Sequence, residues 1–521
     1  MSKRSTEVGG RYAKYVLGVL VLVYVLNFID RQILSILAEE IKADLGISDA
    51  DIGFLYGTAF AVFYAVFGIP LGKLADVWVR KSLISMGLAF WSLMTALSGT
   101  ARSFGMLATF RFGVGIGEAS ASPAAFSMLS DYFEPRMRAT VLAIYSSGVY
   151  IGAGIGIFLG GVIVDSWKSA FPVDPPFGLQ GWQAAFFAVG LPGLIMAVWV
   201  WMLREPQRGV SEGIEQAEEP HPFRETWREL ITVMPPLTLY AAARAGLLIS
   251  NLVGAAAIAA LVYGLIEWLG SPKQWIALGI GVYAAFSWIQ LLKQRDLPAY
   301  RMMFGSKAFL SCAIAFPCVA FVTYGIGFWS PPFMLRVHHV DIAQAGTFLG
   351  LGAALGGWIG VTLGGVLGDR LRRRRVNGRL YIGIGVAAFS IPAALLFLTT
   401  SSIWVAYGAS FLFSIFSPMW IGPAASTIND LVLPRMRASA SAFYILMVTF
   451  IGLALGPYLM GLASDTFVAG GMESGEALRT GMMAGLGIFA VSVTFLVLAM
   501  RYLPGDEASR LDRAREAGES I

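Results

Sequence analysis

Apolar runs of about 20 residues recur along the whole chain, and this recurrence limits its possible folds more than any other feature. At about 1.5 Å per residue, a helix of that length crosses a hydrocarbon core of roughly 30 Å. We count fourteen such runs, and the composition agrees, because 56% of the residues are hydrophobic and 14% are charged. A β-barrel needs alternating segments of about ten residues, which the sequence lacks. We therefore predict an all-α integral membrane protein.

Lysine and arginine gather in the N-terminal segment and in alternate loops after it. The opposite loops are short, neutral or acidic, as in the segment 39–51. Under the positive-inside rule, this pattern predicts that both termini lie in the cytoplasm. The sequence contains no Asn-x-Ser/Thr site, which favours a bacterial inner membrane. The net charge of +5 is explained by these loops, so no nucleic-acid partner is expected.

The spacing of the apolar runs divides the chain into six spans, an inserted pair and six further spans. We predict a cytoplasmic tail at 1–11, a six-helix bundle at 12–203, a cytoplasmic linker at 204–234, an inserted helix pair at 235–304, a second six-helix bundle at 305–502 and a cytoplasmic tail at 503–521. The inserted pair is expected to be two full spans, with one bent or interfacial hairpin as the alternative. The polar C-terminal tail is expected to fray or to lie on the surface.

The two halves share repeated phrases. Pro-Arg-Met-Arg-Ala occurs at 135–139 and at 434–438, 299 positions apart, each time between two apolar runs. A glycine-to-aspartate loop that ends at Asp76 has a counterpart that ends at Asp369, and basic residues follow both. Duplicated membrane halves are typical of transporters that rock around a site at the midplane. We therefore expect pseudo-symmetric bundles in which 12–203 moves against 305–502.

These motifs resemble those of the major facilitator superfamily over nearly the full chain. The loop Gly-Lys-Leu-Ala-Asp76 and the span-four phrase that begins at Arg111 resemble two of its motifs. The phrases Asn-Phe-Ile-Asp30-Arg31 and Gly-Ile-Gly-Glu118-Ala-Ser resemble the Spinster branch. That resemblance implies proton-linked export of lysolipids or sphingoid lipids. The inserted helix pair departs from the twelve spans usual in the branch.

Four ionisable residues lie inside predicted spans of the first half: Asp30 and Arg31 in span one, and Arg111 and Glu118 in span four. Ionisable groups at this depth are costly and usually mark a functional site. At the repeat offset of 299, the second half has Ser410 and Ser417 in place of Arg111 and Glu118. We therefore expect the first half to handle a proton.

The depths of these residues predict a relay of Asp30, Arg111 and Glu118. Asp30 lies about 12 Å, and Arg111 about 10 Å, from the outer end of its span. Arg111 and Glu118 are seven positions apart, on one helix face. The alternative is a static ion pair between spans one and four. Arg31, about 100° around the helix from Asp30, is expected to face the cavity and to hold an anionic headgroup.

Aromatic residues are the remaining candidates for substrate binding. Tyr150, Trp329 and Phe333 are predicted to line an apolar pocket. The alternative is ordinary packing or anchoring at the membrane interface, which is the commoner use of membrane aromatics.

The repeated basic phrases and the two glycine-to-aspartate loops are predicted to form a cytoplasmic gate. In the family that the chain resembles, the loop aspartate makes a removable charge contact with the other half. The residues concerned are Asp76, Arg80, Arg136, Arg138, Asp369, Arg370, Arg435 and Arg437. We expect Asp76 to pair with Arg435 or Arg437, and Asp369 to pair with Arg136 or Arg138. The alternative is that these basic residues only fix the orientation in the membrane.

The sequence offers no motif for ATP, metal or covalent chemistry. It has no phosphate-binding loop and no nucleophile elbow. Its three histidines, His221, His338 and His339, lack the spacing of a zinc site. We therefore expect no metal, no catalytic residue and no enzyme activity. The only energy source expected is a proton gradient.

Three functions remain open at this stage. The first is a proton-driven, monomeric carrier of amphipathic, lipid-like molecules. The second is a carrier of small organic anions, with Arg31 and Arg111 as substrate ligands. The third is a nutrient or lipid sensor that keeps the transporter scaffold and does not turn over.

Overall fold

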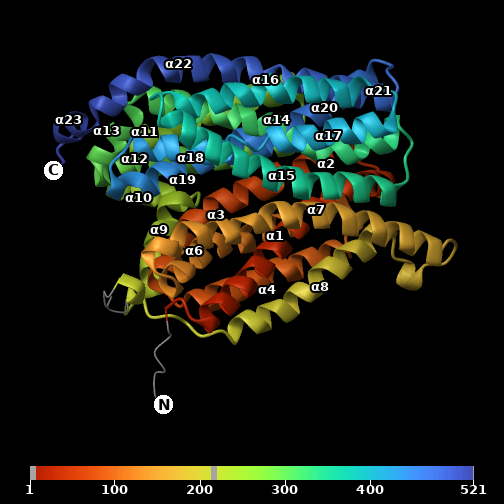
Figure 1. Cartoon of the computed structure of the whole chain (residues 1–521), viewed down its shortest axis with the longest axis horizontal. Coiled ribbons are helices and arrows are strands. Elements are labelled where there is room, and N and C mark those ends of the chain that lie inside the picture. The colour runs from red at the N-terminus through yellow and green to blue at the C-terminus, as the bar shows by residue number, and fades with distance from the viewer. Residues whose placement is uncertain (1–7, 213–219, 520–521) are drawn as a thin grey trace. The chain divides into compact units, whose positions relative to one another are not determined.

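The computed structural model describes residues 8–212 and 220–519, and these contain helices and no strands (Figure 1). Among them, twelve helical segments are long and apolar enough to cross a membrane. Two further segments occupy the predicted third and fourth spans: α4 (Arg80–Ser98), and α5 (Phe104–Glu118) with α6 (Ala121–Tyr132). The predicted all-α membrane fold, with its inserted helix pair, is therefore confirmed.

The chain divides into two compact units that differ from its sequence halves. The first unit contains the described residues of 1–46, 66–230 and 342–354, and the second contains those of 47–65, 231–341 and 355–521. The start of span two thus groups with the second unit, and the start of α15 (Ile342–Arg372) groups with the first. Below, the N-side is the side of the membrane on which α1 (Arg11–Leu45) begins, and the far side is the opposite one.

In the first unit, α1 packs along α7 (Arg138–Ala170), and α4 packs against α5 and α8 (Gly181–Trp201). Glycines set the approach of α7 to α1. A Cβ atom added at Gly152 would lie 2.4 Å from the Val25 carbonyl oxygen, and one at Gly156 would lie 3.0 Å from the Ile29 Cα. Small residues let membrane helices come this close. They hold the backbone just before Asp30 against α7.

In the second unit, α14 (Lys307–Val337) packs against α20 (Leu455–Ala469) and α22 (Ile488–Ala508). This unit also contains α2 (Asp49–Tyr56), the start of α3 (Thr58–Val77), α16 (Gly378–Thr399), α17 (Ile403–Phe416), α18 (Ile421–Asp430), α19 (Arg437–Met447) and α21 (Ser474–Leu486), besides the inserted and C-terminal helices described below. A π-helix, η5 (Val448–Ala454), joins α19 to α20. Cys312 and Cys318 are buried and free, so they serve as packing residues.

The repeated phrase adopts the same structure twice. Pro135–Met137 forms the 3-10 turn η1 before α7, and Pro434–Met436 forms η4 before α19. Proline begins each turn, where its missing N–H costs nothing. The duplication inferred from the sequence is therefore also present in the local backbone.

The inserted region is more divided than predicted. The linker contains α9 (Pro222–Val233), and the first inserted run splits into α10 (Leu237–Arg244) and α11 (Leu248–Leu269). Gly246, between them, has a φ of 70°, which glycine adopts without strain. α12 (Pro272–Arg295) and α13 (Leu297–Phe304) follow. Both α11 and α12 are long and apolar enough to span, in agreement with a pair of full spans.

Over the residues described, the C-terminal tail does not fray but forms a helix on the surface, which was the second of the two outcomes expected. α22 continues to Ala508, and α23 (Arg510–Glu516) packs against α13 with Ala514 fully buried. The Asp506 carboxylate accepts hydrogen bonds from the Ser306 hydroxyl at 2.7 Å and from the Ala308 N–H at 2.9 Å. These polar contacts hold a segment whose low apolar content suggested exposure.

Candidate functional site

A buried ion pair joins spans one and four in the first unit. The Arg31 Nη2 lies 2.7 Å from the Glu118 Oε2, and the two side chains are 9% and 0% exposed. The Arg31 guanidinium also lies 4.6 Å from the centre of the Phe28 ring. A pair this deep carries a large desolvation cost, so it is weak evidence for a purely stabilising role.

Asp30 and Arg111 complete the cluster. The Arg111 Nη1 donates to the Asp30 backbone carbonyl at 3.2 Å, and both residues are buried. The side chains of Trp91 and Thr95, from α4, lie beside the Asp30 carboxyl group. The expected correspondence in depth between Asp30 and Arg111 is therefore present. Two acids and two guanidinium groups stand together in the membrane interior.

Local packing explains why these side chains meet. α5 ends at Glu118, and span four resumes as α6 at Ala121. A Cβ atom at Gly117 would lie 2.8 Å from the Trp91 Cβ, so glycine lets α5 lie directly against α4. Glu118 therefore sits at a break in span four, next to a tight helix contact.

The partner of Arg31 corrects one expectation. We expected Arg31 to face the cavity and the relay to run through Arg111 to Glu118. In this structure Arg31 is instead the hydrogen-bonding partner of Glu118. The helical angle of about 100° gives the direction of the Cβ, but a long arginine side chain can reach across it. Arg31 therefore belongs to the charge cluster.

The three aromatic candidates for substrate binding differ in burial. Tyr150 is half-buried. Trp329 is fully buried, and its indole N–H donates to the Pro457 carbonyl at 2.8 Å. Phe333 is also fully buried and lies 4.9 Å, centre to centre, from the Phe397 ring. The expectation that Trp329 and Phe333 line a pocket is wrong for this conformation, in which both are packing residues.

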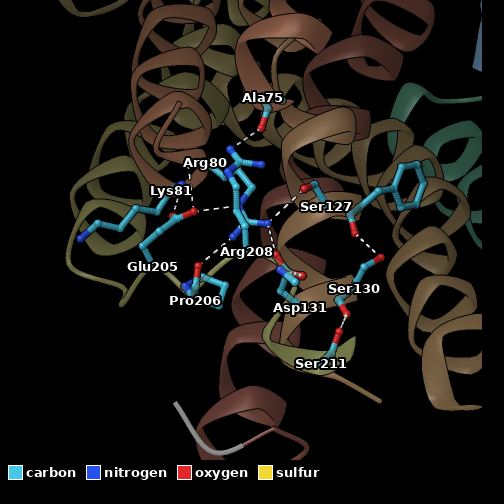
Figure 2. A network of polar contacts seen from close by, with 12 residues as sticks. Ala75, Arg80, Lys81, Ser127, Ser130, Asp131, Glu205, Pro206, Arg208 and Ser211 are labelled. Atoms are coloured by element: carbon cyan, nitrogen blue, oxygen red, sulfur yellow. Dashed lines mark hydrogen bonds and ion pairs between the residues drawn. The ribbon is translucent and has the colours of Figure 1, made fainter. Parts of the chain in front are cut away.

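On the N-side of the first unit, Arg80 is the centre of a polar network (Figure 2). It is fully buried, its Nε donates to Glu205 at 2.7 Å, and it forms an ion pair with Asp131. Figure 2 shows Arg208 beside it, where its Nη2 donates to the carbonyls of Ala75 at 2.8 Å and Trp78 at 2.6 Å. The chain after span six thus binds the ends of spans two, three and four.

The second unit repeats the core of this network. Arg379 lies 299 positions after Arg80, and Asp430 lies 299 positions after Asp131. The Arg379 Nη1 is 2.5 Å from Asp430, and its Nη2 is 2.9 Å from Asp369. Here the arginine side chain is 17% exposed, whereas that of Arg80 is buried. Sequence analysis missed Arg379, although the repeat offset applied to Arg80 identifies it.

The gate residues have other partners than those expected. Asp369 binds Arg379 rather than Arg136 or Arg138, and Arg136 pairs with Glu134. Arg138 donates to the Ser130 carbonyl and the Ser211 hydroxyl, and Arg435 binds Asp296 and Glu519. The positive charges near Asp76 are those of Lys73 and Arg208. Arg370 and Arg437 are exposed. Arg136 and Arg435 thus bind acids of their own unit, and Arg138 binds serine oxygens of its own unit, which the motif alone does not reveal.

Arg435, Asp296 and Glu519 form a clasp in which both acids have lowered pKa values. Burial raises the pKa of Asp296, but three effects together outweigh burial and lower this pKa: the hydrogen bond from Arg435 at 2.7 Å, the hydrogen bond from the Ala299 N–H at 3.0 Å and the positive charge of Arg435. The hydrogen bond from Arg435 also lowers the pKa of Glu519. Both acids therefore favour their charged forms.

Sequence analysis missed a second buried ion pair, on the far side of the second unit. The Arg336 guanidinium binds the Asp49 carboxylate through two contacts of 2.7 and 2.6 Å, and the Ser464 hydroxyl donates to the same carboxylate at 2.7 Å. The Asp465 carboxylate accepts from the N–H groups of Asp49 at 3.0 Å and Ala50 at 2.7 Å. Asp465 was not among the predicted site residues.

Duplicated helical halves, with buried charges in the membrane interior, define the class of secondary transporters that work by alternating access. The Major Facilitator Superfamily family model matches residues 20–457, so the chain belongs to that superfamily. It is 26% identical to an MFS-type efflux pump of Mycolicibacterium smegmatis over 90% of this chain and 89% of that protein. It is also 26% identical to human Protein spinster homolog 1, over 89% and 75% of the two chains.

Solved structures agree with this family. A bacterial homologue of the human lysosomal transporter Spinster, in an inward-facing and unoccupied conformation, superimposes with a TM-score of 0.72. It is 27% identical, and the match covers 96% of this chain and 99% of that one. A proton-dependent oligopeptide transporter shares the fold, with a TM-score of 0.61 at 15% identity. The chain is therefore a multi-pass membrane transporter of the Spinster type.

Proposed function

We propose that this transporter is proton-coupled and moves an amphipathic molecule of lysolipid or sphingoid type. The observation that carries the proposal is the buried cluster of Asp30, Arg31, Arg111 and Glu118 in the first half. The corresponding positions of span four in the second half hold Ser410 and Ser417, so the shared scaffold does not require these charges. The choice of cargo is supported by the likeness to Spinster proteins.

The cluster suggests how a proton and a substrate headgroup are linked. With both acids ionised, its two negative and two positive charges cancel. A proton taken up by Glu118 weakens the contact with Arg31 and leaves one positive charge in a poorly solvated site. Arg31 is then available to an anionic headgroup. Binding of the proton and the substrate is thereby coupled, and the coupling acts equally in both directions.

The orientation in the membrane is assigned from the distribution of basic residues. We propose that the N-side is the cytoplasm of a bacterium, since the N-side loops contain Arg80, Lys81 and the arginines of 370–375. The networks around Arg80 and Arg379 lie at this face and belong to the cytoplasmic gate. The transporter is proposed to act as a monomer without an enzymatic step. Its energy comes from the proton gradient.

The alternative of a small organic anion as cargo rests on the same guanidinium groups. Arg31 and Arg111 would then bind the anion directly. In the conformation described Arg31 is paired with Glu118, so a small anion, like a lipid headgroup, would bind Arg31 only after that pair opens. A sensor without turnover is the other alternative.

Reconstituted vesicles with an imposed pH gradient distinguish these functions. We expect gradient-dependent movement of a fluorescent lysolipid and none of a labelled small organic acid. Asp30→Asn and Glu118→Gln should abolish the dependence on the gradient. The matched control is Lys168→Gln, which removes an exposed far-side pair with Glu40, 2.6 Å long, in the same unit. Movement of the organic acid alone would establish the second alternative, and no flux of either compound would favour the sensor.

A further inference from the structure

The far-side ion pair ties the start of span two to two helices of the other sequence half. Asp49 begins α2, whereas Arg336 ends α14 and Ser464 lies in α20. Asp49 is 1% exposed and the Arg336 side chain is 8% exposed, so the pair is nearly dry. Removing either partner leaves a buried charge without compensation, which is strongly unfavourable. We call Asp49, Arg336, Ser464 and Asp465 the far-side lock.

Backbone contact reinforces the far-side lock. A Cβ atom at Gly53 would lie 2.7 Å from the Pro457 carbonyl oxygen, and one at Gly461 would lie 2.6 Å from the Asp49 carbonyl oxygen. The Thr58 hydroxyl donates to the Ala454 carbonyl, in the π-helix η5, at 3.1 Å. When the spans are numbered without the inserted pair, α17 and α18 form span ten, and α19, η5 and α20 form span eleven. Span two and span eleven are therefore in direct contact over about two helical turns on the far side.

The inserted helix pair binds the same place. Lys273, at the start of α12, forms an ion pair with Asp51 of α2. The Trp275 ring stands perpendicular to the Tyr458 ring of α20, with centres 5.7 Å apart. Further along α12, a Cβ atom at Gly281 would lie 2.7 Å from the Phe450 ring and 3.3 Å from the Val62 side chain. α12 thus contacts span two and span eleven along its length.

We propose that the far-side lock is a gate of the transport cycle and that the inserted helix pair is its clamp, with Lys273 as a positioning residue. Alternating access requires the far side to open. Because α2 belongs to the first half in sequence and α14 and α20 to the second, opening must separate Asp49 from Arg336. The inserted pair contacts both sides of this joint and so resists its opening. This inference rests on transport by alternating access and not on protons or on a particular cargo.

Distance measurements between spin labels test the gate directly. Labels on Phe177→Cys and Met472→Cys, at far-side loop positions that are 95% and 37% exposed, report on far-side opening. We expect Asp49→Asn to raise the population with a long distance by at least about tenfold. Lys273→Gln should raise it by about 1.5- to 5-fold, the scale of a partly exposed pair. Lys168→Gln, the matched far-side lysine, should leave the distribution unchanged.

Charge exchange keeps the test decisive if a single variant folds poorly. The double variant Asp51→Lys with Lys273→Asp should restore the wild-type distance distribution, because the pair is re-formed with its charges exchanged. An unchanged distribution in Asp49→Asn would overturn the gate. A response to Asp49→Asn without any response to Lys273→Gln, or an equal response to Lys168→Gln, would overturn the role of the inserted pair.

Discussion

Spans four and ten have the same shape and different chemistry. Span four breaks between α5, which ends at Glu118, and α6, which begins at Ala121. Span ten breaks between α17, which ends at Phe416, and α18, which begins at Ile421. At the break, span four has a buried glutamate and span ten has Ser417, which is 4% exposed. The break is thus compatible with a neutral side chain, which points to a functional reason for the buried charge.

The largest difference in stability between the two spans is expected when the carboxylate at the break of span four is removed. Glu118→Ala leaves the buried Arg31 without its partner, which should lower the free energy of unfolding by about 3–5 kcal/mol. The matched change Ser417→Ala, in the second half, should cost about 1 kcal/mol or less. Denaturation in detergent, followed by the fluorescence of the tryptophans, measures both. Equal losses in the two variants would show that the breaks do not differ as described.

The two arginine networks on the N-side provide the next comparison. Arg80 is fully buried with several partners, so Arg80→Gln should cost about 2–3 kcal/mol of unfolding free energy. Its repeat partner Arg379 is partly exposed, and Arg379→Gln should cost about 1 kcal/mol because water compensates part of the loss. Thermal unfolding of the two variants side by side measures the difference. A larger loss at Arg379 would contradict the assigned order.

Much of this architecture was predictable from the sequence, for an identifiable reason. Hydrophobic length reports spans directly, and a repeat of 299 positions locates equivalent residues, as it does for Asp131 and Asp430. The members of the charge cluster were also predictable, because so few ionisable residues lie within spans. The role of Arg31 was predicted wrongly, because its long side chain reaches Glu118 although its Cβ points elsewhere on the helix.

Other features lay beyond sequence reasoning. Asp49 and Arg336 are 287 positions apart, and no motif links them. Asp49 also looks like an ordinary acidic residue in the first turn of a helix, a position that acids favour in any case. The folded C-terminal tail depends on Asp506 and Glu519 finding partners on other helices, which local composition does not encode.

A smaller loss of stability is expected from alanine at a glycine of α7, where the first half packs most closely. Gly156→Ala places a Cβ atom 3.0 Å from the Ile29 Cα, next to Asp30, and should cost about 1–3 kcal/mol through overpacking. Gly385→Ala, in α16 of the second half, meets no atom within 4 Å and should change the unfolding free energy by about 0.5 kcal/mol or less. Chemical denaturation compares the two. A neutral Gly156→Ala would contradict the close approach of α1 and α7.

The smallest effect is expected at the clasp of Arg435, Asp296 and Glu519. Both acids have lowered pKa values when folded, so their contribution to stability is present above their ordinary values of about 4 and is lost as pH falls further. Acidification from about pH 5 to pH 3 should therefore lower the protection of 510–519 from hydrogen exchange, measured against the intrinsic exchange rate at each pH. Arg435→Gln should exchange faster at the higher pH already and show less change. Protection that does not change with pH in the wild-type chain would contradict the clasp.

Proton movement driven by substrate tests the central claim, that the charge cluster of the first half couples transport to protons. A lysolipid gradient is imposed across vesicles that contain the transporter, and a trapped pH dye records protons. We expect a pH change in the wild-type protein and in Ser417→Ala. We expect none in Glu118→Gln, even where exchange of labelled for unlabelled lysolipid persists. An undiminished pH change in Glu118→Gln would contradict the account.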